Sequence, residues 1–352
     1  MENDIRELSS ESTSTITRGA AVSSAYTNQP IMYGAEIIDA AKNRLFFLQA
    51  VNIVMLPQGH KDYVEYKRTA YLGKDGVTFD SGEKAGTEIS NTLLNNQTGV
   101  VITPAFYSAK IHLEDYAIRV NVHGLLEFAK EELIYATMDK VDQYVATTLG
   151  DATVATSSAA GATLLFGGDA TSDSKLEAGD ILTPEKISDA IRYLEGTDVY
   201  YWNSTTFTKV AAATATKNGW VGYDKVLFIA PAQKNALQKD SQFTNAAEYG
   251  NNEVVMNGEI GKYLDVKVIV TNNVEKANSA ATGPDGTTAS ANMTRCILCV
   301  PRKALTFVWG IEPQIKVTPM PWQAAQAVTL EMAFQAKTIH DDSIVFIDVS
   351  DD

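Results

Sequence analysis

The stretch Asp62–Val120 constrains the fold of this chain more than any other stretch does. Two runs rich in strand-forming residues, Tyr63–Leu72 and Gly99–Val120, flank a polar middle, Gly73–Thr98, that is rich in Gly, Asp, Glu, Asn and Lys. The pattern predicts a long two-stranded hairpin with a polar tip. An isolated hairpin is only marginally stable in water, and we identify no partner for this one elsewhere in the sequence. We therefore expect it to rest on another molecule.

The strongest helix signal covers Asn121–Asp151. About 28 helical residues would reach roughly 42 Å, a length that spans a whole domain. Apolar residues recur at helical spacing and form one stripe, whereas charged residues give a solvated side. The stripe consists of Ile134, Met138, Val141, Val145 and Leu149, and the solvated side of Glu127, Lys130, Glu131, Asp139, Lys140 and Asp142.

The second half of the chain alternates strands and helices without a repeat. A helix is predicted after Thr183, which can cap it, with Pro184 at its first position and Gly196 at its end. Further along, Asp224–Pro231 predicts a buried strand and Ala232–Gly250 a helix. Strands are also predicted at 266–271, 295–301, 304–311, 313–319, 327–339 and 343–349, with polar loops at 152–180 and 275–294. This order indicates an α+β fold rather than a doubly wound sheet.

Composition and charge argue against several classes of function. The 352 residues are 45% hydrophobic, which is typical of globular proteins with room for two or three domains. No apolar run approaches the roughly 20 residues of a membrane helix, and the polar start of the chain does not resemble a signal peptide. A net charge of −14 without a Lys/Arg-rich block argues against sequence-specific nucleic-acid binding. The first thirty residues, rich in Ser and Thr, predict an arm that orders only against a partner.

The two cysteines, Cys296 and Cys299, form a Cys-x-x-Cys motif. A zinc site would need two further ligands, and the sequence offers neither a second cysteine pair nor paired histidines. The motif lies in an apolar run that predicts a buried strand, where residues three apart point to opposite faces and disfavour a disulfide. We expect two free, buried thiols.

No pattern predicts a catalytic, cofactor-binding or metal-binding residue. The histidines His60, His112, His123 and His340 are not spaced to share a metal, and the sequence holds no nucleophile elbow, P-loop or dinucleotide-binding motif. The acidic stretch Asp169–Asp180 lacks the glycine and closing glutamate of a calcium loop. We expect a protein that is not an enzyme, with an unrecognised carboxylate site as the alternative.

Gly258 and Gly261 form a Gly-x-x-Gly motif of the kind that clamps nucleic-acid backbone in some RNA-binding modules. Such a loop joins two helices and carries basic residues, whereas here Glu259 lies within it and a strand follows. Val266, Val268 and Val270 share one face of that strand. The motif therefore predicts a tight turn before a half-buried strand.

A specific order of motifs surrounds this turn. A strand ending at Pro231 leads to a helix with a Ser-Gln-Phe segment at 241–243, then to the glycine turn, the valine strand and an Asn-rich end at Asn272–Asn273. This order resembles the second half of the tailed-virus major capsid proteins with the Hong Kong 97 fold, and the resemblance extends over nearly the whole chain.

The resemblance implies an α+β, Hong Kong 97-like chain with five parts. They are an N-terminal arm (1–50), an extended β-hairpin loop with flanking strands that lies on a neighbouring subunit (51–120), a peripheral domain with a long spine helix (121–182), an axial domain (183–308), and C-terminal strands that return to the peripheral domain (309–352). Residues 199–223, with Trp202 and Trp220, depart from the pattern as an insertion, expected to be a hairpin at the capsomer surface. No fused scaffolding segment is evident, and Lys74 and Lys84 in the extended loop do not by themselves predict a crosslink.

The same resemblance implies a structural role. The chain would self-assemble into hexamers and pentamers of an icosahedral shell around double-stranded DNA, in a virion assembled in the host cytoplasm. Portal, scaffolding and decoration proteins are the implied partners, with DNA held without sequence-specific binding and with no membrane contact. The alternative is an encapsulin-type shell of a cellular nanocompartment, which the insertion and the Ser/Thr-rich arm disfavour.

Overall fold

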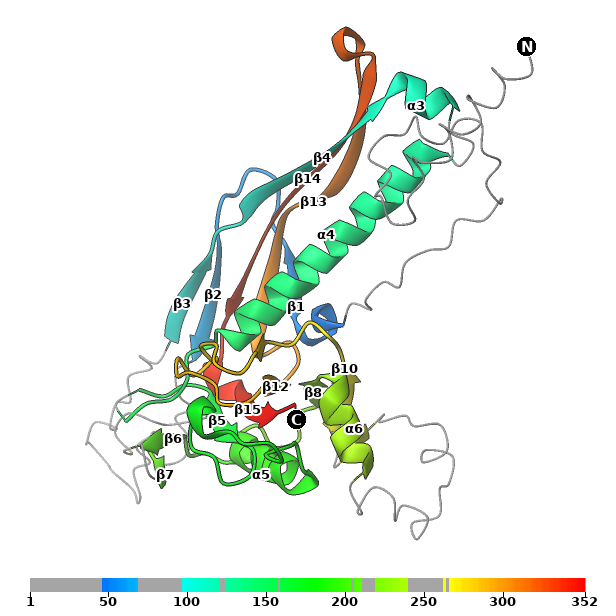
Figure 1. Cartoon of the computed structure of the whole chain (residues 1–352). Coiled ribbons are helices and arrows are strands. Elements are labelled where there is room, and N and C mark those ends of the chain that lie inside the picture. Colours follow the sequence, from blue (N-terminus) through cyan, green and yellow to red (C-terminus); the bar gives the residue numbers. More distant parts are fainter. Residues whose placement is uncertain are drawn as a thin grey trace, which may run out of the picture. The chain divides into compact units, whose positions relative to one another are not determined.

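The computed structural model describes residues 46–68, 97–120, 124–157, 159–203, 206–210, 219–239, 262–263 and 266–351 (Figure 1). Two compact units divide the chain. Among the described residues, the smaller unit comprises 108–135 and 314–331, and the larger unit comprises the rest. The chain contains both helices and strands, in a non-repeating order, so the predicted α+β class is confirmed.

A seven-stranded sheet forms the core of the larger unit. Its order is β5-β15-β12-β8-β10-β9, with β11 paired to β12. Every residue of β8, β12 and β15 is buried, which explains their nearly continuous apolar runs. The strands are β5 (Thr163–Phe166), β8 (Lys225–Ile229), β9 (Lys262–Tyr263), β10 (Val266–Val270), β11 (Lys276–Ala277), β12 (Met293–Cys299) and β15 (Ile344–Ser350).

Helix α5 (Pro184–Glu195) packs against β5 and β15 of this sheet and buries Ile187, Ala190 and Leu194. Its start is as predicted: the Thr183 hydroxyl accepts a hydrogen bond from Lys186 N, Pro184 is the first helical residue, and Gly196 follows the end. Helix α6 (Pro231–Lys239) begins the predicted segment 232–250, whose remainder lies outside the described residues.

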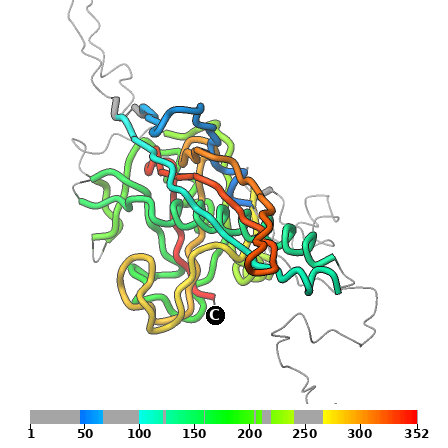
Figure 2. The backbone as a smooth tube through the Cα atoms, turned by 90° about the horizontal axis from the view of Figure 1, so that it is seen from above, coloured from blue at the N-terminus to red at the C-terminus, as the bar shows by residue number. Residues whose placement is uncertain are grey.

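A four-stranded sheet has the order β1-β13-β14-β4. Its strands are β1 (Asn52–Met55), β4 (Ala105–Glu114), β13 (Leu305–Met320) and β14 (Ala325–Thr338), and Figure 2 shows β13 and β14 running side by side. The strand-like runs predicted at 304–311 and 313–319 are confirmed as strand, and the structure joins them into one, because β13 continues through Pro313. Since β1 pairs only with Thr306–Trp309, the following part of β13 has an open edge among the described strands, where proline is tolerated.

The excursion begins as predicted with an antiparallel pair, β2 (Tyr63–Arg68) and β3 (Gln97–Ile102), and its tip lies outside the described residues. Its far end differs from the prediction, because residues 115–120 form helix α3 (Asp115–Val120) instead of continuing a strand. Asp115 in the first turn and Arg119 in the last turn complement the helix dipole. Within the same unit, Asp115 N donates to Ala324 O over 2.8 Å.

The predicted long helix is confirmed as α4 (Leu125–Gly150). Its C-terminal half buries Val141, Val145 and Leu149, whereas Ile134 and Met138 of the same stripe are about half exposed, at 48% and 49%. None of the helices in the described part of the chain is long and apolar enough to cross a membrane.

The assignment of Asp142 to the solvated side of this helix was wrong, because its side chain is fully buried. One carboxylate oxygen accepts a hydrogen bond from Phe47 N and the other from Asn273 Nδ2, each over 2.9 Å. Both donors are remote in sequence, so the helical pattern alone could not reveal them. Burial raises the pKa of Asp142, and these hydrogen bonds oppose that rise.

The remaining elements are short. Strands β6 (Tyr200–Asn203) and β7 (Thr206–Lys209) form a separate hairpin in the predicted insertion. The 3-10 helices are Phe47–Ala50, Asp173–Lys175, Pro321–Gln323 and Asp341–Ser343. Within the C-terminal segment 309–352, β14 and most of β13 belong to the four-stranded sheet, whereas β15 lies between β5 and β12 in the seven-stranded one.

Candidate interaction surfaces

The β2–β3 hairpin has two apolar faces. Cross-strand pairing places Tyr63 opposite Ile102 and Glu65 opposite Val100 on the inner face. There Ile102, Tyr63 and Val100 pack with Val308 and Ile339 in a small core. The base of the hairpin is therefore anchored to its own subunit through one face.

The outer face of the hairpin carries Val64, Tyr66 and Val101, with Val64 directly opposite Val101 and Tyr66 opposite Gly99. These three side chains are 42%, 72% and 47% exposed. A Cβ added at Gly99 would lie 3.3 Å from both the Tyr66 ring and Val64, so the glycine leaves room for the Tyr66 ring to cross the strand pair. Contiguous exposed apolar side chains of this kind mark interaction sites.

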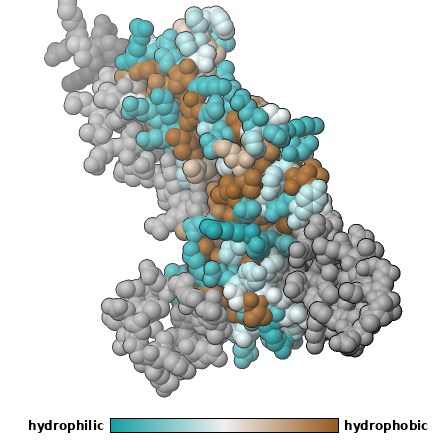
Figure 3. Space-filling model, turned by 180° about the vertical axis from the view of Figure 1, so that it is seen from behind, coloured by the Kyte–Doolittle hydropathy of each residue, from teal (hydrophilic) through white to brown (hydrophobic). Residues whose placement is uncertain are grey.

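The smaller unit also exposes large apolar side chains. Trp322, in the turn between β13 and β14, is 83% exposed, and Val317 and Phe128 are 40% exposed. Figure 3 shows apolar side chains reaching the surface in patches between hydrophilic ones on one face of the molecule. Aromatic residues on the surface are typical anchors of protein–protein interfaces.

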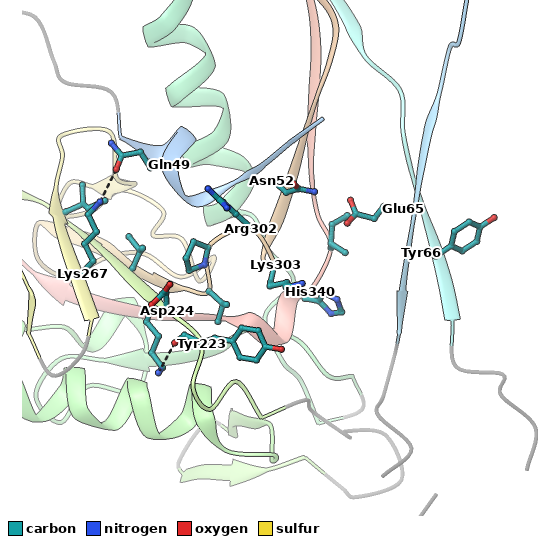
Figure 4. Close-up of a pocket in the computed structure, with 16 residues that line it drawn as sticks. Gln49, Asn52, Glu65, Tyr66, Tyr223, Asp224, Lys267, Arg302, Lys303 and His340 are labelled. Atoms are coloured by element: carbon teal, nitrogen blue, oxygen red, sulfur yellow. Dashed lines mark hydrogen bonds between the residues drawn. The ribbon is translucent and has the colours of Figure 1, made fainter. Parts of the chain in front are cut away.

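A recess of about 960 Å³ lies in the larger unit, between the start of the described chain, strand β2, strands β8 and β10, and the turn after β12. Its basic residues are Lys225, Lys267, Arg302 and Lys303, and its acidic residues are Glu65 and Asp224. Figure 4 shows Glu65 pointing toward the recess and Tyr66 pointing away from it. We call this feature the basic recess.

Three of the titratable groups around the basic recess have partners. Lys225 Nζ lies 2.7 Å from Glu195 Oε1, Lys267 Nζ donates to Gln49 Oε1 over 3.1 Å, and His340 Nδ1 lies 3.6 Å from Asp342 Oδ1. Arg302 and Lys303, by contrast, form no ion pair with any residue in the described ranges. The Glu65 Oε2 atom is buried and has no hydrogen-bond partner among those residues.

The predicted acidic stretch Asp169–Asp180 forms part of a buried polar network. Asp173 N donates to Asp285 Oδ2 over 2.8 Å, and Asp285 N donates back to Asp173 Oδ2 over 2.9 Å. Asp180 Oδ2 accepts from Glu177 N over 2.9 Å. Within the described residues, no group of acidic, His or Cys side chains could hold a metal ion. Here the acidic side chains join loop backbones.

One arginine lies among the carboxylates of this network. Asp348 accepts two hydrogen bonds from Arg295, and both side chains are buried. Burial, followed by the nearby Asp348 charge, raises the pKa of Asp173 to about 9, so this side chain is neutral at pH 7. Burial also opposes ionisation of Asp285, but hydrogen bonds from Asp173 and Thr287 outweigh it and lower the pKa of Asp285.

The segment 199–223, predicted as an insertion, contains a hairpin, in which 200–203 pair with 206–209. Tyr200 stacks on Phe207 with ring centroids 5.3 Å apart, and Trp202 lies 5.9 Å from Phe166. Trp220 does not join the hairpin, because it is buried in the main core of the larger unit. The hairpin is thus held by aromatic contacts to its own subunit.

The thiols are as predicted: Cys296 and Cys299 are free and buried on β12. Burial raises the pKa of Cys299 to about 12 and that of Cys296 well above its ordinary value. The turn predicted at Gly258 and Gly261 lies outside the described residues, as do Lys74, Lys84 and His123. The strand predicted after these glycines is confirmed as β10, which buries Val266 and Val268.

Sequence patterns did not reveal the basic recess or the exposed outer face of the hairpin. The recess is built from two to four residues in each of six separated segments, none of which carries a local signal. The outer face did have a signal, since each strand has apolar residues on both of its faces: Tyr63 and Val64 in β2, and Val101 and Ile102 in β3. Periodicity identified the strands and could not indicate which face is covered.

Neither protein-family models nor curated proteins match this sequence. Among solved structures, the capsid of the cyanophage P-SCSP1u superposes with a TM-score of 0.67 at 13% identity, covering 92% of this chain and 94% of that one. A capsid of a native GTA particle gives 0.63 at 10% identity, covering 94% and 100%. The head of the Helicobacter pylori bacteriophage KHP40 gives 0.61 at 11% identity, covering 93% and 98%.

These similarities extend over nearly the full length of both chains in each pair. At such low identities they show a shared fold, which is the one that the motif order of the sequence predicted. The expectation of a tailed-phage capsid fold is therefore confirmed.

Proposed function

We propose that this protein is the major shell subunit of a tailed virus, whose copies assemble into hexamers and pentamers and close an icosahedral shell around double-stranded DNA. The observation that carries the proposal is the exposed apolar outer face of the β2–β3 hairpin in a chain with a capsid fold. A hairpin that is anchored through one face and apolar on the other is suited to lie on a second subunit.

The energetics of this face favour association. Covering a Val or aromatic side chain stabilises a complex by about 1.5–3 kcal/mol when its burial is complete. Val64, Tyr66 and Val101 leave much of their surface exposed in the single chain. Covering each of them on assembly would therefore contribute part of that free energy. Trp322 offers a further anchor in the smaller unit, and each such contact is repeated in every subunit of a symmetric shell.

The polar groups of the larger unit support a structural role over an enzymatic one. The carboxyl groups of Asp173, Asp285 and Asp348 accept hydrogen bonds from backbone amides or from Arg295, and they tie together segments that are remote in sequence. Catalytic carboxylates would instead face a cleft that a substrate can enter. In the shell subunit, these side chains hold remote segments of the chain together.

The viral shell is favoured over the encapsulin alternative, because the similar structures reported above come from phage and GTA particles. Within the proposal, 1–50 is the arm, 51–120 the extended loop, 121–182 and 309–352 the peripheral domain, and 183–308 the axial domain. Two strands are exceptions to these ranges: we assign β5, within 121–182, and β15, within 309–352, to the axial domain, because they pair within its sheet.

Further partners follow from the proposed role. Portal, scaffolding and decoration proteins are the expected protein partners, and DNA would be enclosed without sequence-specific contacts. The virion capsid would be the site of the mature protein, after assembly in the host cytoplasm. The hairpin of the insertion at 200–209 would lie on the capsomer surface.

Sedimentation velocity combined with negative-stain electron microscopy of the purified chain tests the proposal. We expect capsomers, tubes or closed shells whose fraction rises with protein concentration. A monodisperse monomer at every concentration and ionic strength would contradict a shell subunit.

A further inference from the structure

The basic recess carries two cationic side chains, Arg302 and Lys303, that form no ion pair within the described part of the chain. Arg302 and Lys303 lie in a turn in which Lys303 N donates to Val300 O over 3.3 Å and Ala304 N donates to the same oxygen over 3.2 Å. Arg302 has a positive φ of 62°, an uncommon conformation for a residue other than glycine. Its amide donates to Ala50 O over 2.7 Å, so the turn is attached to the beginning of the described chain.

These features fit an acidic peptide as the occupant. Lys267, Arg302 and Lys303 bring three cationic groups to one recess, and none of them forms an ion pair within the described ranges. Lys267 donates only to the neutral Gln49 among those residues. Arg and Lys side chains bind carboxylates through charge-assisted hydrogen bonds. The carboxylates Glu65 and Asp224 also line the recess and would repel an acidic ligand. Such a ligand would therefore be attracted most strongly beside the turn that carries Arg302 and Lys303.

One segment of the chain has the matching charge and position. Glu2, Asp4, Glu7 and Glu11 place four carboxylates within ten residues, with Arg6 as the one basic side chain among them. The described chain then begins beside the recess: Phe47 stacks on Phe228 with centroids 4.2 Å apart, and Gln49 and Asn52 line the recess itself. The 34 residues between Glu11 and Phe46 could extend over about 115 Å, which is ample to reach the recess.

We propose that the basic recess binds the acidic N-terminal segment Glu2–Glu11 through Lys267, Arg302 and Lys303, within one subunit or from a neighbouring copy. The recess thereby anchors the far end of the N-terminal arm. The pairing is electrostatic and partly exposed to solvent, so it weakens as ionic strength rises. It does not depend on shell formation.

Zero-length carbodiimide crosslinking of the full-length chain, followed by mass spectrometry, tests this pairing, because the reagent joins a lysine amine to a carboxylate in contact with it. We expect amide links from Lys303 or Lys267 to Glu2, Asp4, Glu7 or Glu11, and we expect their yield to fall at high salt. The intact mass confirms that residues 1–11 are present. The exposed pair Lys209–Asp198, at 2.6 Å, serves as the internal positive control.

Two variants sharpen the test. Arg302→Glu should reduce the yield of these links roughly tenfold, whereas Lys276→Glu, an exposed reversal on β11 outside the recess, should leave it unchanged. A monomer or dimer band on a denaturing gel reports whether the segment comes from the same or a neighbouring copy, and either band supports the pairing. Links of Lys267 and Lys303 to other acidic segments, or none at all while Lys209–Asp198 crosslinks, would overturn it. Loss of shell assembly with the links intact would count against the proposed function alone.

Discussion

The Asp348 carboxylate accepts a hydrogen bond from Arg295 Nε over 2.8 Å and a second from Arg295 Nη2 over 2.7 Å. Both side chains are buried, and the guanidinium also lies 4.7 Å from the centroid of the Phe346 ring. Because β12 and β15 are adjacent in the seven-stranded sheet, with Arg295 directly opposite Asp348, this ion pair joins the two central strands of the larger unit.

Removing one partner of this pair should strongly destabilise the subunit. Arg295→Met leaves the Asp348 charge buried without compensation, and we expect the free energy of unfolding to fall by about 3–5 kcal/mol. Urea denaturation followed by circular dichroism measures the change. Lys209→Met, which removes an exposed ion pair with Asp198, is the matched control and should leave stability nearly unchanged. Equal losses in the two variants would contradict a special role for the buried pair.

Asp173 should make stability depend on pH. Its folded-state pKa of about 9 lies above the ordinary value of 3.8, so between about pH 4 and 9 the folded protein holds a proton that the unfolded chain lacks. The contribution of Asp173 to the free energy of unfolding is fully present below about pH 4. It is lost as the pH rises, by up to about 1.4 kcal/mol per pH unit. Asp173→Asn is neutral at all pH values and should not show this slope.

Unfolding free energies of wild type and Asp173→Asn, measured from pH 5 to pH 9, test this account. We expect the variant to gain stability relative to wild type as pH increases. Asp285, Asp348 and Arg295 are present in both proteins, so their titration affects the comparison only through coupling to position 173. Parallel curves for the two proteins would show that Asp173 is ionised in the folded state.

The outer face of the hairpin should matter for assembly rather than for folding. The double variant Val64→Thr with Tyr66→Thr keeps strand-forming residues and removes exposed apolar surface, so we expect soluble folded subunits and a strong loss of assembled particles. Ile102→Thr, on the buried inner face, should instead lower the free energy of unfolding by about 2–4 kcal/mol. Sedimentation velocity and thermal unfolding separate the two effects. Normal assembly of the double variant would exclude the outer face as an interface.

The two thiols should be unreactive in the folded protein. Burial raises the pKa of Cys299 to about 12 and that of Cys296 well above its ordinary value, and the thiolate is the reactive form. A colourimetric thiol reagent at pH 8 should therefore modify neither residue until the subunit unfolds, and both should react in denaturant. Rapid modification of the native protein would contradict the buried position of β12.

Local sequence patterns predicted the helices and strands that are determined by residues close together in the sequence. Thr183, Pro184 and Gly196 delimit α5 through capping chemistry, and the apolar runs of β8, β12 and β15 follow from burial on both faces. The unpredicted features depend on distant contacts. Asp142 is buried because Phe47 and Asn273 supply donors, and β13 continues through Pro313 where β1 has ended.

The candidate sites, too, could not be predicted where they depend on contacts between residues distant in sequence. A family-like order of motifs predicted the fold, although identity to the similar solved structures is only 10–13%. The basic recess had no such signal, because Gln49, Glu65, Lys267 and Arg302 come together only through the sheet order and the turn after β12. Sequence alone likewise could not show that Val64 and Tyr66 face outward.

An image reconstruction by electron cryo-microscopy of particles assembled from the purified chain tests the central claim most directly. The account predicts an icosahedral shell of hexamers and pentamers in which Val64, Tyr66 and Val101 are covered by a neighbouring subunit. Particles in which this outer face is open to solvent, or a sample that remains monomeric under all assembly conditions, would contradict it.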